Sequence, residues 1–130
     1  ARSGVVAVEP LIQVLDDHDD SIRRRAARVL GEIGDPRAVS GLMNLLHDDF
    51  YSVRREVETA FIAIGVPAME SVVSALNDPD GDVRRRAADV LTEIGDARVI
   101  APLERISDDE DWYARKAAEN AVARIRERTE

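Results

Sequence analysis

The 130-residue sequence contains no cysteine, which excludes disulfide bonds, thiolate metal sites and cysteine nucleophiles. Aromatic residues make up only 4% of the chain, as expected where helices pack closely through small and branched aliphatic side chains. No apolar run approaches the roughly 20 residues that a bilayer span needs, and no signal peptide is visible. We therefore expect a cytoplasmic protein without membrane contact, although the start at Ala1 leaves a removed leading segment open.

Lysine is almost absent, because 17 of the 18 basic residues are arginine and Lys116 is the other. The 26 acidic residues give a formal net charge of −8. This balance disfavours nucleic acid and anionic membranes as partners. An excess of arginine and aspartate is also typical of a salt-adapted or GC-rich coding background, so the charge reflects either a partner or the host.

The sequence is rich in internal repetition. Four segments of about 31 residues align almost without gaps, at 7–37, 38–67, 68–98 and 99–129. A period of this length indicates an α-solenoid, in which each repeat buries its apolar face against its neighbours. We expect one repeat domain over residues 1–130.

Each repeat has the pattern of two helices joined by an acidic turn. We expect the first helices over 8–15, 39–47, 69–76 and 100–107. The second helix carries a narrow apolar stripe, which in the first repeat consists of Ile22, Ala26, Val29, Leu30 and Ile33. It stops at Gly34, Gly65 or Gly95, where we expect the left-handed backbone conformation that glycine tolerates.

The repeat reads AVxPLxxxLxDxDxxVRRxAAxxLGxIGDxR. The paired arginines, the following Ala-Ala and the Gly-Asp ending resemble the HEAT-like repeat of phycobilisome lyases, from Val5 to about Thr129. This resemblance implies an all-α fold: a right-handed α-α superhelix, or HEAT-like solenoid, of about four two-helix repeats. It also implies that the second helices line the concave side.

The acidic turns hold 13 of the 26 acidic residues. Capping of the second helix explains one carboxylate per turn, and a cation-binding edge is the alternative. The two histidines, His18 and His47, lie in or beside these turns without the His-Glu pairs that bind iron in related hydroxylases. We expect no metal, no cofactor and no catalytic residue.

Arginine recurs at the second position of the second helix. The four residues are Arg23, Arg54, Arg84 and Arg115. This position flanks the apolar stripe, where a neighbouring repeat packs, so we expect a structural ladder between repeats. The expected carboxylate partners are Asp35 and Asp96 at the repeat junctions.

The next position is basic in every repeat and points away from the stripe. It is occupied by Arg24, Arg55, Arg85 and Lys116. We interpret these residues, with Asp89, either as a solvated face or as a basic row that binds an acidic segment of another protein. Ile62 stands at an outward angle where other repeats carry Gly31 and Thr92, and is either an apolar anchor for the partner or an isolated surface residue.

Four of the five aromatic residues fall at turns that lead into a second helix. They are Phe50, Tyr51, Trp112 and Tyr113. Such residues form either secondary binding patches at the edge of the stack or local staples over the preceding helix.

These features predict a protein–protein interaction module, acting as scaffold or regulator, that binds a protein with an acidic or mixed face. The alternatives are an enzyme-associated module related to phycobilin lyases and, less favoured by the charge, a nucleic-acid-binding HEAT-like protein. Because 4–7 resembles 65–68, we expect a preceding repeat in a longer protein. Its absence would expose Val8, Leu11 and Ile12 and permit a homodimer through the first repeat.

Overall fold

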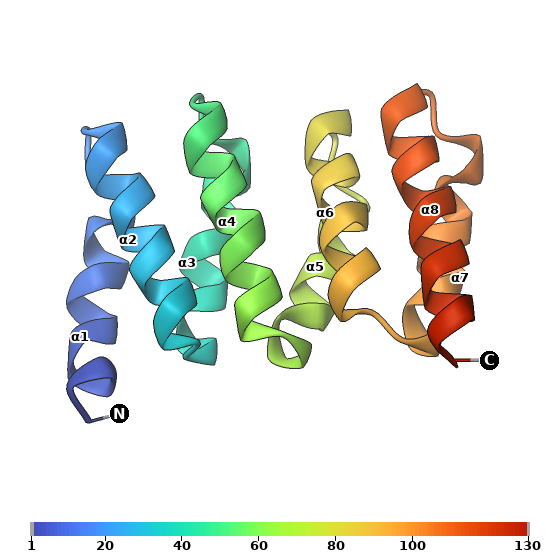
Figure 1. The fold of residues 1–130 in the computed structure, drawn as a ribbon. Helices are drawn as coiled ribbons and strands as arrows, with labels where there is room; N and C mark the ends of the chain where they lie inside the picture. The colour runs from blue at the N-terminus through green and yellow to red at the C-terminus, as the bar shows by residue number, and fades with distance from the viewer. Residues whose placement is uncertain (1, 130) are drawn as a thin grey trace. The chain divides into compact units, whose positions relative to one another are not determined.

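The computed structural model describes the backbone of residues 2–129 and the side chains of residues 7–129. This part of the chain forms eight α-helices and no strand (Figure 1), which confirms the predicted all-α repeat fold. The first helices of the four pairs are α1 (Arg2–Gln13), α3 (Val39–Asn44), α5 (Met69–Ala75) and α7 (Ile100–Glu104). The second helices are α2 (Asp20–Ile33), α4 (Tyr51–Ile64), α6 (Gly81–Ile94) and α8 (Trp112–Thr129).

Three of the first helices end in a 3-10 turn, which accounts for their longer predicted extent. The turns are Val14–Asp16, Leu45–His47 and Arg105–Asp108. Helix α1 also begins earlier than predicted, because 4–7 is helical. The matching segment after α4 differs: Gly65 has a positive φ of 78°, and Val66–Ala68 forms a 3-10 turn that contains Pro67.

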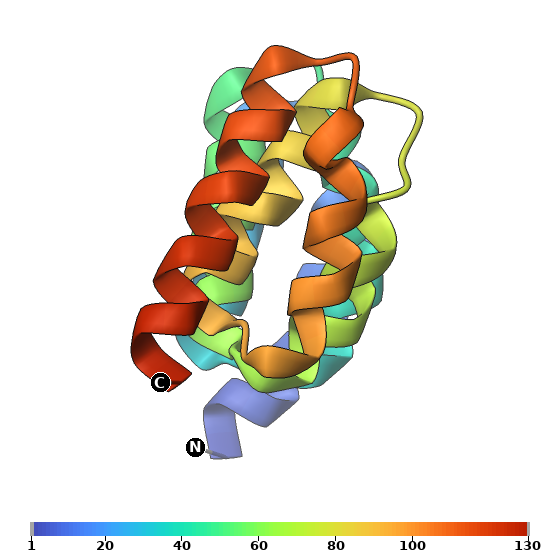
Figure 2. The same cartoon turned by 90° about the vertical axis from the view of Figure 1, so that its right-hand side faces the viewer.

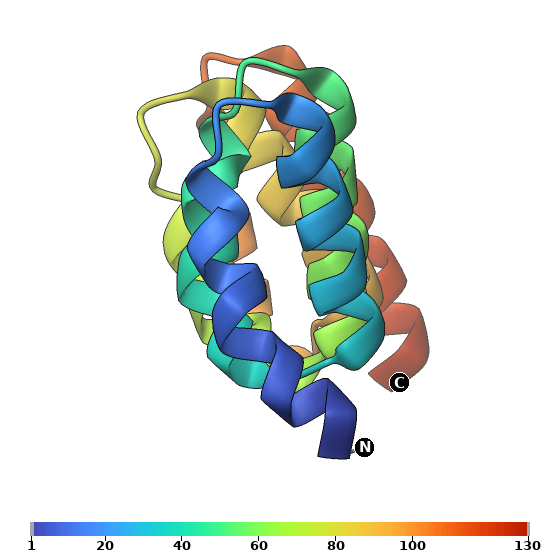
Figure 3. The same cartoon turned by 90° about the vertical axis from the view of Figure 1, so that its left-hand side faces the viewer.

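The chain divides between Ala68 and Met69 into two compact units of two helix pairs each. In unit 1, α2 lies beside α4, and in unit 2, α6 lies beside α8 (Figure 1). Figure 3 faces α1 and α2 of unit 1, and Figure 2 faces α7 and α8 of unit 2. In both views the first and second helix of a pair run side by side.

The core of unit 1 consists of aliphatic side chains and Phe61, and α2 approaches α4 closely. A Cβ atom at Gly31 would lie 2.7 Å from the Ala60 Cα, so only glycine allows this approach. Thr92 holds the corresponding place in α6, where its buried hydroxyl donates to the Ala88 carbonyl at 2.9 Å. The helix pairs therefore pack through small residues.

Two of the three predicted glycine stops have the positive φ that favours glycine: Gly34, which is left-handed with φ 74° and ψ 20°, and Gly65, which has φ 78° and ψ −140°. The prediction is wrong for Gly95, whose φ is −75°. A Cβ there would lie 2.5 Å from the Leu91 carbonyl oxygen, so space and not the dihedral angle requires this glycine. Arg128 completes the end of α6 by donating to the Thr92 and Gly95 carbonyls at 2.6 and 2.9 Å.

Between α1 and α2, the exposed large apolar side chains belong to α2. Val8 is fully buried, whereas Ile22 and Val29 are 40% and 37% exposed. The prediction of an exposed apolar face on α1 is wrong for Val8, because α1 packs on α2, whereas Leu11 and Ile12 are half-buried. No single helix in residues 2–129 is both long and apolar enough to cross a membrane.

Candidate functional site

Three of the acidic turns cap the helix that follows them, and in the last of these the Asp111 carboxylate accepts the Ala114 N–H at 3.1 Å. The Asp19 carboxylate accepts the Ser21 N–H at 2.8 Å, and the Asp80 carboxylate accepts the Asp82 N–H at 2.9 Å. Capping therefore explains these carboxylates. Helix α4 departs from the rule, because Phe50 occupies its N-cap position and offers no side-chain acceptor.

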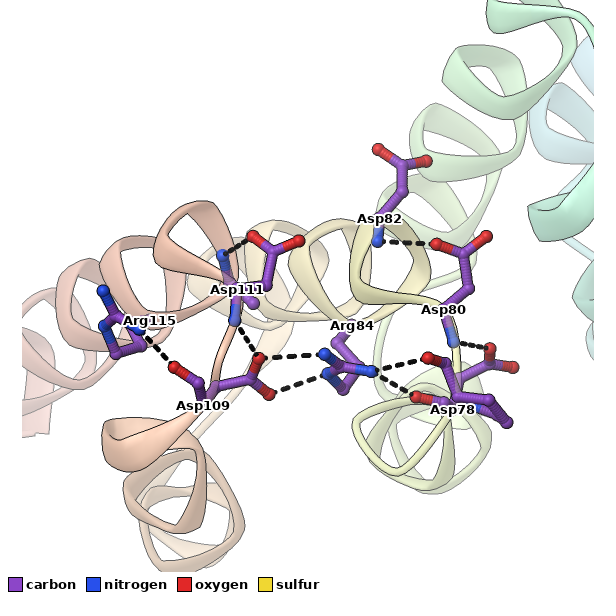
Figure 4. A network of polar contacts seen from close by, with 9 residues as sticks. Asp78, Asp80, Asp82, Arg84, Asp109, Asp111 and Arg115 are labelled. Atoms are coloured by element: carbon purple, nitrogen blue, oxygen red, sulfur yellow. Dashed lines mark hydrogen bonds and ion pairs between the residues drawn. The ribbon is translucent and has the colours of Figure 1, made fainter.

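The recurring arginine joins one helix pair to the next within each unit. In unit 1, Arg23 binds the Asp48 carboxylate at 2.7 and 3.2 Å and the Asp17 carbonyl at 2.6 Å. In unit 2, Arg84 binds the Asp109 carboxylate at 2.7 and 2.9 Å (Figure 4). Each contact is bidentate and partly buried, and both guanidinium groups also bind carbonyls of their own turn.

The predicted partners of this ladder are wrong. Asp35 pairs with Arg37 at 3.0 Å, and Asp96 pairs with Arg98 at 2.6 Å. The recurring arginine begins the second helix, whereas these two aspartates follow the opposite end of that helix. The remaining two arginines bind carbonyls in the same way: Arg54 donates to Asp48 and Arg115 to Asp109.

The ladder shifts the pKa of its carboxylates. The Arg84 hydrogen bonds hold the pKa of Asp109 below its ordinary value. Burial raises the pKa of Asp48, but hydrogen bonds from Arg23 and from the Phe50 N–H outweigh it, so this pKa is also lowered. Both carboxylates are therefore ionised at neutral pH.

The four residues of the predicted basic row differ between the units. In unit 2, Arg85 pairs with Asp82 at 2.9 Å and with Asp89 at 3.4 Å. Burial raises the pKa of Asp89. Lys116 lies 3.3 Å from Glu119 and 5.8 Å from the centre of the Trp112 ring.

In unit 1 the corresponding cations have no carboxylate partner among the described residues. The Arg24 side chain makes no hydrogen bond or ion pair with residues 7–129, and Arg55 donates to the Tyr51 hydroxyl at 3.3 Å. Arg55 is exposed and Arg24 is half-buried. The uncompensated positive charge of the row therefore lies on α2 and α4.

A groove of about 310 Å³ lies between α2 and α4. Its sides carry Arg28, Glu32, Glu56, Thr59 and Ala63. Arg28 and Glu56 approach to 3.6 Å across it. Sequence reasoning missed this groove, although the replacement of a repeated arginine by Glu56 and the glycine at position 31 were visible signals.

Ile62 is 40% exposed, in agreement with the surface position predicted for it. Its role as an apolar anchor for a partner stays a prediction. Its counterparts Gly31 and Thr92 are buried, and Gly31 lies against the neighbouring second helix.

The four aromatic residues at the turns are all half or more exposed, which does not fit a staple over the first helix. They form two patches, one in each unit. Phe50 lies under the Arg23 guanidinium at 5.9 Å, with Tyr51 next in sequence. Trp112 and Tyr113 meet edge to face with ring centres 5.1 Å apart.

His18 and His47 line the same hollow of unit 1, which has a volume of about 480 Å³ and also contains Arg23. Among the described residues no group of three or more His, Cys, Asp or Glu side chains is arranged to hold a metal ion. The Arg23–Asp48 ion pair also lines this hollow.

Comparison with known proteins finds partial relatives of similar sequence. Phycocyanobilin lyase subunit alpha of Microchaete diplosiphon is 45% identical over 53 residues, which cover 35% of this chain and 18% of the relative. Phycocyanobilin lyase subunit beta of Pseudanabaena tenuis is 45% identical over 53 residues, which cover 40% of this chain and 19% of the relative. The chain thus spans about a fifth of the length of the curated relatives it matches.

Two engineered proteins of known structure share the fold. One has a TM-score of 0.54 at 22% identity, over 94% of this chain and 63% of the other. The second has a TM-score of 0.52 at 23% identity, over 92% of this chain and 37% of the other. The family model for HEAT repeats matches residues 6–62 and 69–130. The chain belongs to the HEAT-repeat family.

Proposed function

We propose that this protein is an interaction module whose α2–α4 face in unit 1 binds an acidic segment of another protein. The observation that carries the proposal is the lack of a carboxylate partner for Arg24 and Arg55 within the described residues. In unit 2 the corresponding Arg85 and Lys116 are paired with carboxylates of the chain itself.

Uncompensated surface arginines favour partners of opposite charge, both in affinity and in the rate of encounter. The acidic segment would place a carboxylate at each of Arg24 and Arg55. The groove beside them contains Glu32 and Glu56 together with Thr59 and Ala63, so it suits an uncharged side chain of the partner. A mixed acidic and apolar segment therefore fits this face better than a uniformly acidic one.

The aromatic edge of the same unit supports the proposal. Phe50 replaces the capping aspartate found at the start of α2 and α6, so α4 forgoes a stabilising hydrogen bond. Tyr51 lies beside it and its hydroxyl accepts from Arg55. Departures from local rules concentrate at functional sites, and exposed aromatic residues are enriched in interfaces.

The test is a selection of displayed peptides of about 15 residues on the intact chain. We expect the selected peptides to combine acidic and apolar residues. The double variant Arg24→Glu/Arg55→Glu should weaken their binding by about tenfold or more, which corresponds to about 1.4 kcal/mol.

The matched control is Arg85→Glu/Lys116→Glu, which reverses the same number of charges at the equivalent places of unit 2. Binding to this control should remain within about threefold of wild type. Equal losses in both double variants would mean that net charge and not the α2–α4 face governs binding. Circular dichroism checks that both variants keep their helical content.

A second candidate function rests on the identity with the phycocyanobilin lyase subunits over 53 residues. In that case the chain would be a module of an enzyme that acts on phycocyanobilin. Titration with phycocyanobilin, followed by visible absorption, tests this candidate. A spectral change that saturates near one equivalent supports it, and an unchanged spectrum in excess pigment removes it.

A further inference from the structure

The faces of α2 and α8 that point away from their neighbouring second helices carry complementary features. One is the side of α2 turned away from α4, in unit 1 (Figure 3). The other is the side of α8 turned away from α6, in unit 2 (Figure 2). Inside each unit, the equivalent face of a second helix packs on the other second helix of that unit.

The arginine ladder leaves an acceptor at the first face and a donor at the second. Asp17, Asp48 and Asp109 hold the same place, because each accepts the N–H two residues ahead. Asp48 and Asp109 also receive a bidentate arginine, but no side chain of residues 7–129 donates to the Asp17 carboxylate.

Arg115 is the matching donor. Like Arg23 and Arg84, it binds a carbonyl of its own turn, that of Asp109 (Figure 4). Arg23 and Arg84 use their Nε and Nη2 atoms for a carboxylate of the next helix pair, whereas no carboxylate of the described residues binds Arg115.

The apolar surfaces at the two faces also match. Ile22 and Val29 are exposed, although their counterparts Val53 and Ala60 are fully buried. On α8 and α7 a cleft of about 290 Å³ has an apolar floor of Leu103, Ala118, Val122 and Ala123. The equivalent residues of the first helix pair are buried, and Gly31 among them contacts Ala60 of α4. These residues are Ala26, Leu30 and Gly31, which correspond to Ala118, Val122 and Ala123.

The charged residues around these surfaces are complementary as well. Inside unit 1, Arg28 of α2 faces Glu56 of α4. By repeat alignment, the residue of α2 that corresponds to Glu56 is Arg25, which is exposed on the free face of α2. The residue of α8 that corresponds to Arg28 is Asn120, and the exposed Glu119 precedes it. Arg25 would therefore meet a neutral and an acidic residue.

We propose that two copies of this chain associate head to tail, with the free face of α2 from one copy seated on the α7–α8 cleft of the other. Val29 and Ile22 fill the cleft, Arg115 binds Asp17 across the interface, and Arg25 approaches Glu119. This arrangement replaces the head-to-head homodimer expected from the sequence. Because such a contact is heterologous, a third copy can add in the same way.

The test uses light scattering and sedimentation equilibrium of the intact chain over increasing concentration. We expect the average mass of wild type to rise beyond that of a dimer. Val29→Asp, which blocks the α2 face, and Ala123→Asp, which blocks the cleft, should each remain monomeric. An equimolar mixture of these two variants should form dimers and nothing larger, because one intact face of each kind remains.

Ala101→Asp is the matched control, since it adds the same charge at an exposed place of α7, outside the residues that line the cleft. It should associate as wild type does, and Arg115→Met should weaken association about tenfold through loss of the bidentate pair.

A wild type that stays monomeric at millimolar concentration would overturn the proposal and leave these faces to repeats of another chain. Single variants that still dimerise would indicate a symmetric contact instead. None of these substitutions touches Arg24 or Arg55, so the outcome is independent of the function proposed above.

Discussion

At the residue scale, the second-position arginine does two things at once. Arg84 satisfies the Asp78 carbonyl at 2.8 Å within its own turn and the Asp109 carboxylate of the next helix pair. Its recurrence in the sequence was sufficient to predict a ladder, but the identity of the carboxylate depends on which ends of the helices lie together. Figure 4 shows Arg84 between two of the acidic turns, that of Asp78 and that of Asp109.

We predict that Arg84→Met destabilises the protein by about 2–3 kcal/mol at pH 7, because it leaves the partly buried Asp109 carboxylate without its counter-charge. The pKa of Asp109 is lower in the folded than in the unfolded chain, so the pair stabilises above the ordinary aspartate pKa of about 3.9. That contribution is lost as the pH falls through the lowered pKa. The difference between wild type and variant should therefore shrink in acid.

Urea unfolding at pH 7 and at about pH 3 measures this difference. Arg105→Met is the control, because Arg105 is exposed and lines the same hollow as Arg84 without a hydrogen bond in the described residues. A free-energy difference for Arg84→Met that does not depend on pH would show that the carbonyl contacts, and not Asp109, account for the effect.

At the element scale, the helices follow the local signals of the sequence except where α4 begins. Asp19 and Asp80 cap α2 and α6, and Gly34 ends α2 in the left-handed conformation. Phe50 has the extended backbone of an N-cap, with φ −98° and ψ 124°, but lacks the acceptor. Helix α4 is therefore held by packing of its buried stripe more than by its first turn.

We predict that Phe50→Asp raises the free energy of unfolding by about 0.5–1 kcal/mol, because it supplies the missing acceptor to the first turn of α4. Thermal and urea denaturation followed by circular dichroism measures the change. Tyr51→Asp is the matched control, since it adds the same charge one residue later without the capping geometry. Equal stabilisation by both substitutions would mean that charge near the helix start, and not the cap, is responsible.

At the scale of the whole molecule, the contacts are made between helices that are close in sequence. The two ladder pairs, Arg23–Asp48 and Arg84–Asp109, both join residues 25 apart. Helix α2 packs on α1 and α4, and α8 packs on α6 and α7. Each unit can therefore form without closing a long loop.

We predict that the main refolding phase after dilution from urea is complete within milliseconds, as for other helical proteins dominated by local contacts. Stopped-flow circular dichroism measures the rate. A main phase slower than about one second would contradict the argument that local helix packing limits folding.

The sequence by itself determined the helical class, the four helix pairs, the capping of second helices by their acidic turns and the apolar stripe, because these follow from periodicity and from interactions within a few residues. Tertiary structure decided the rest. The packing of one helix pair on the next selected Asp48 and Asp109 as the arginine partners, and it left too little room for a Cβ atom at position 95. It also left Ile22 and Val29 exposed and Arg24 without a carboxylate partner. These properties depend on how side chains from different helices pack together, as in the ladder pairs 25 residues apart, and no local pattern encodes this packing.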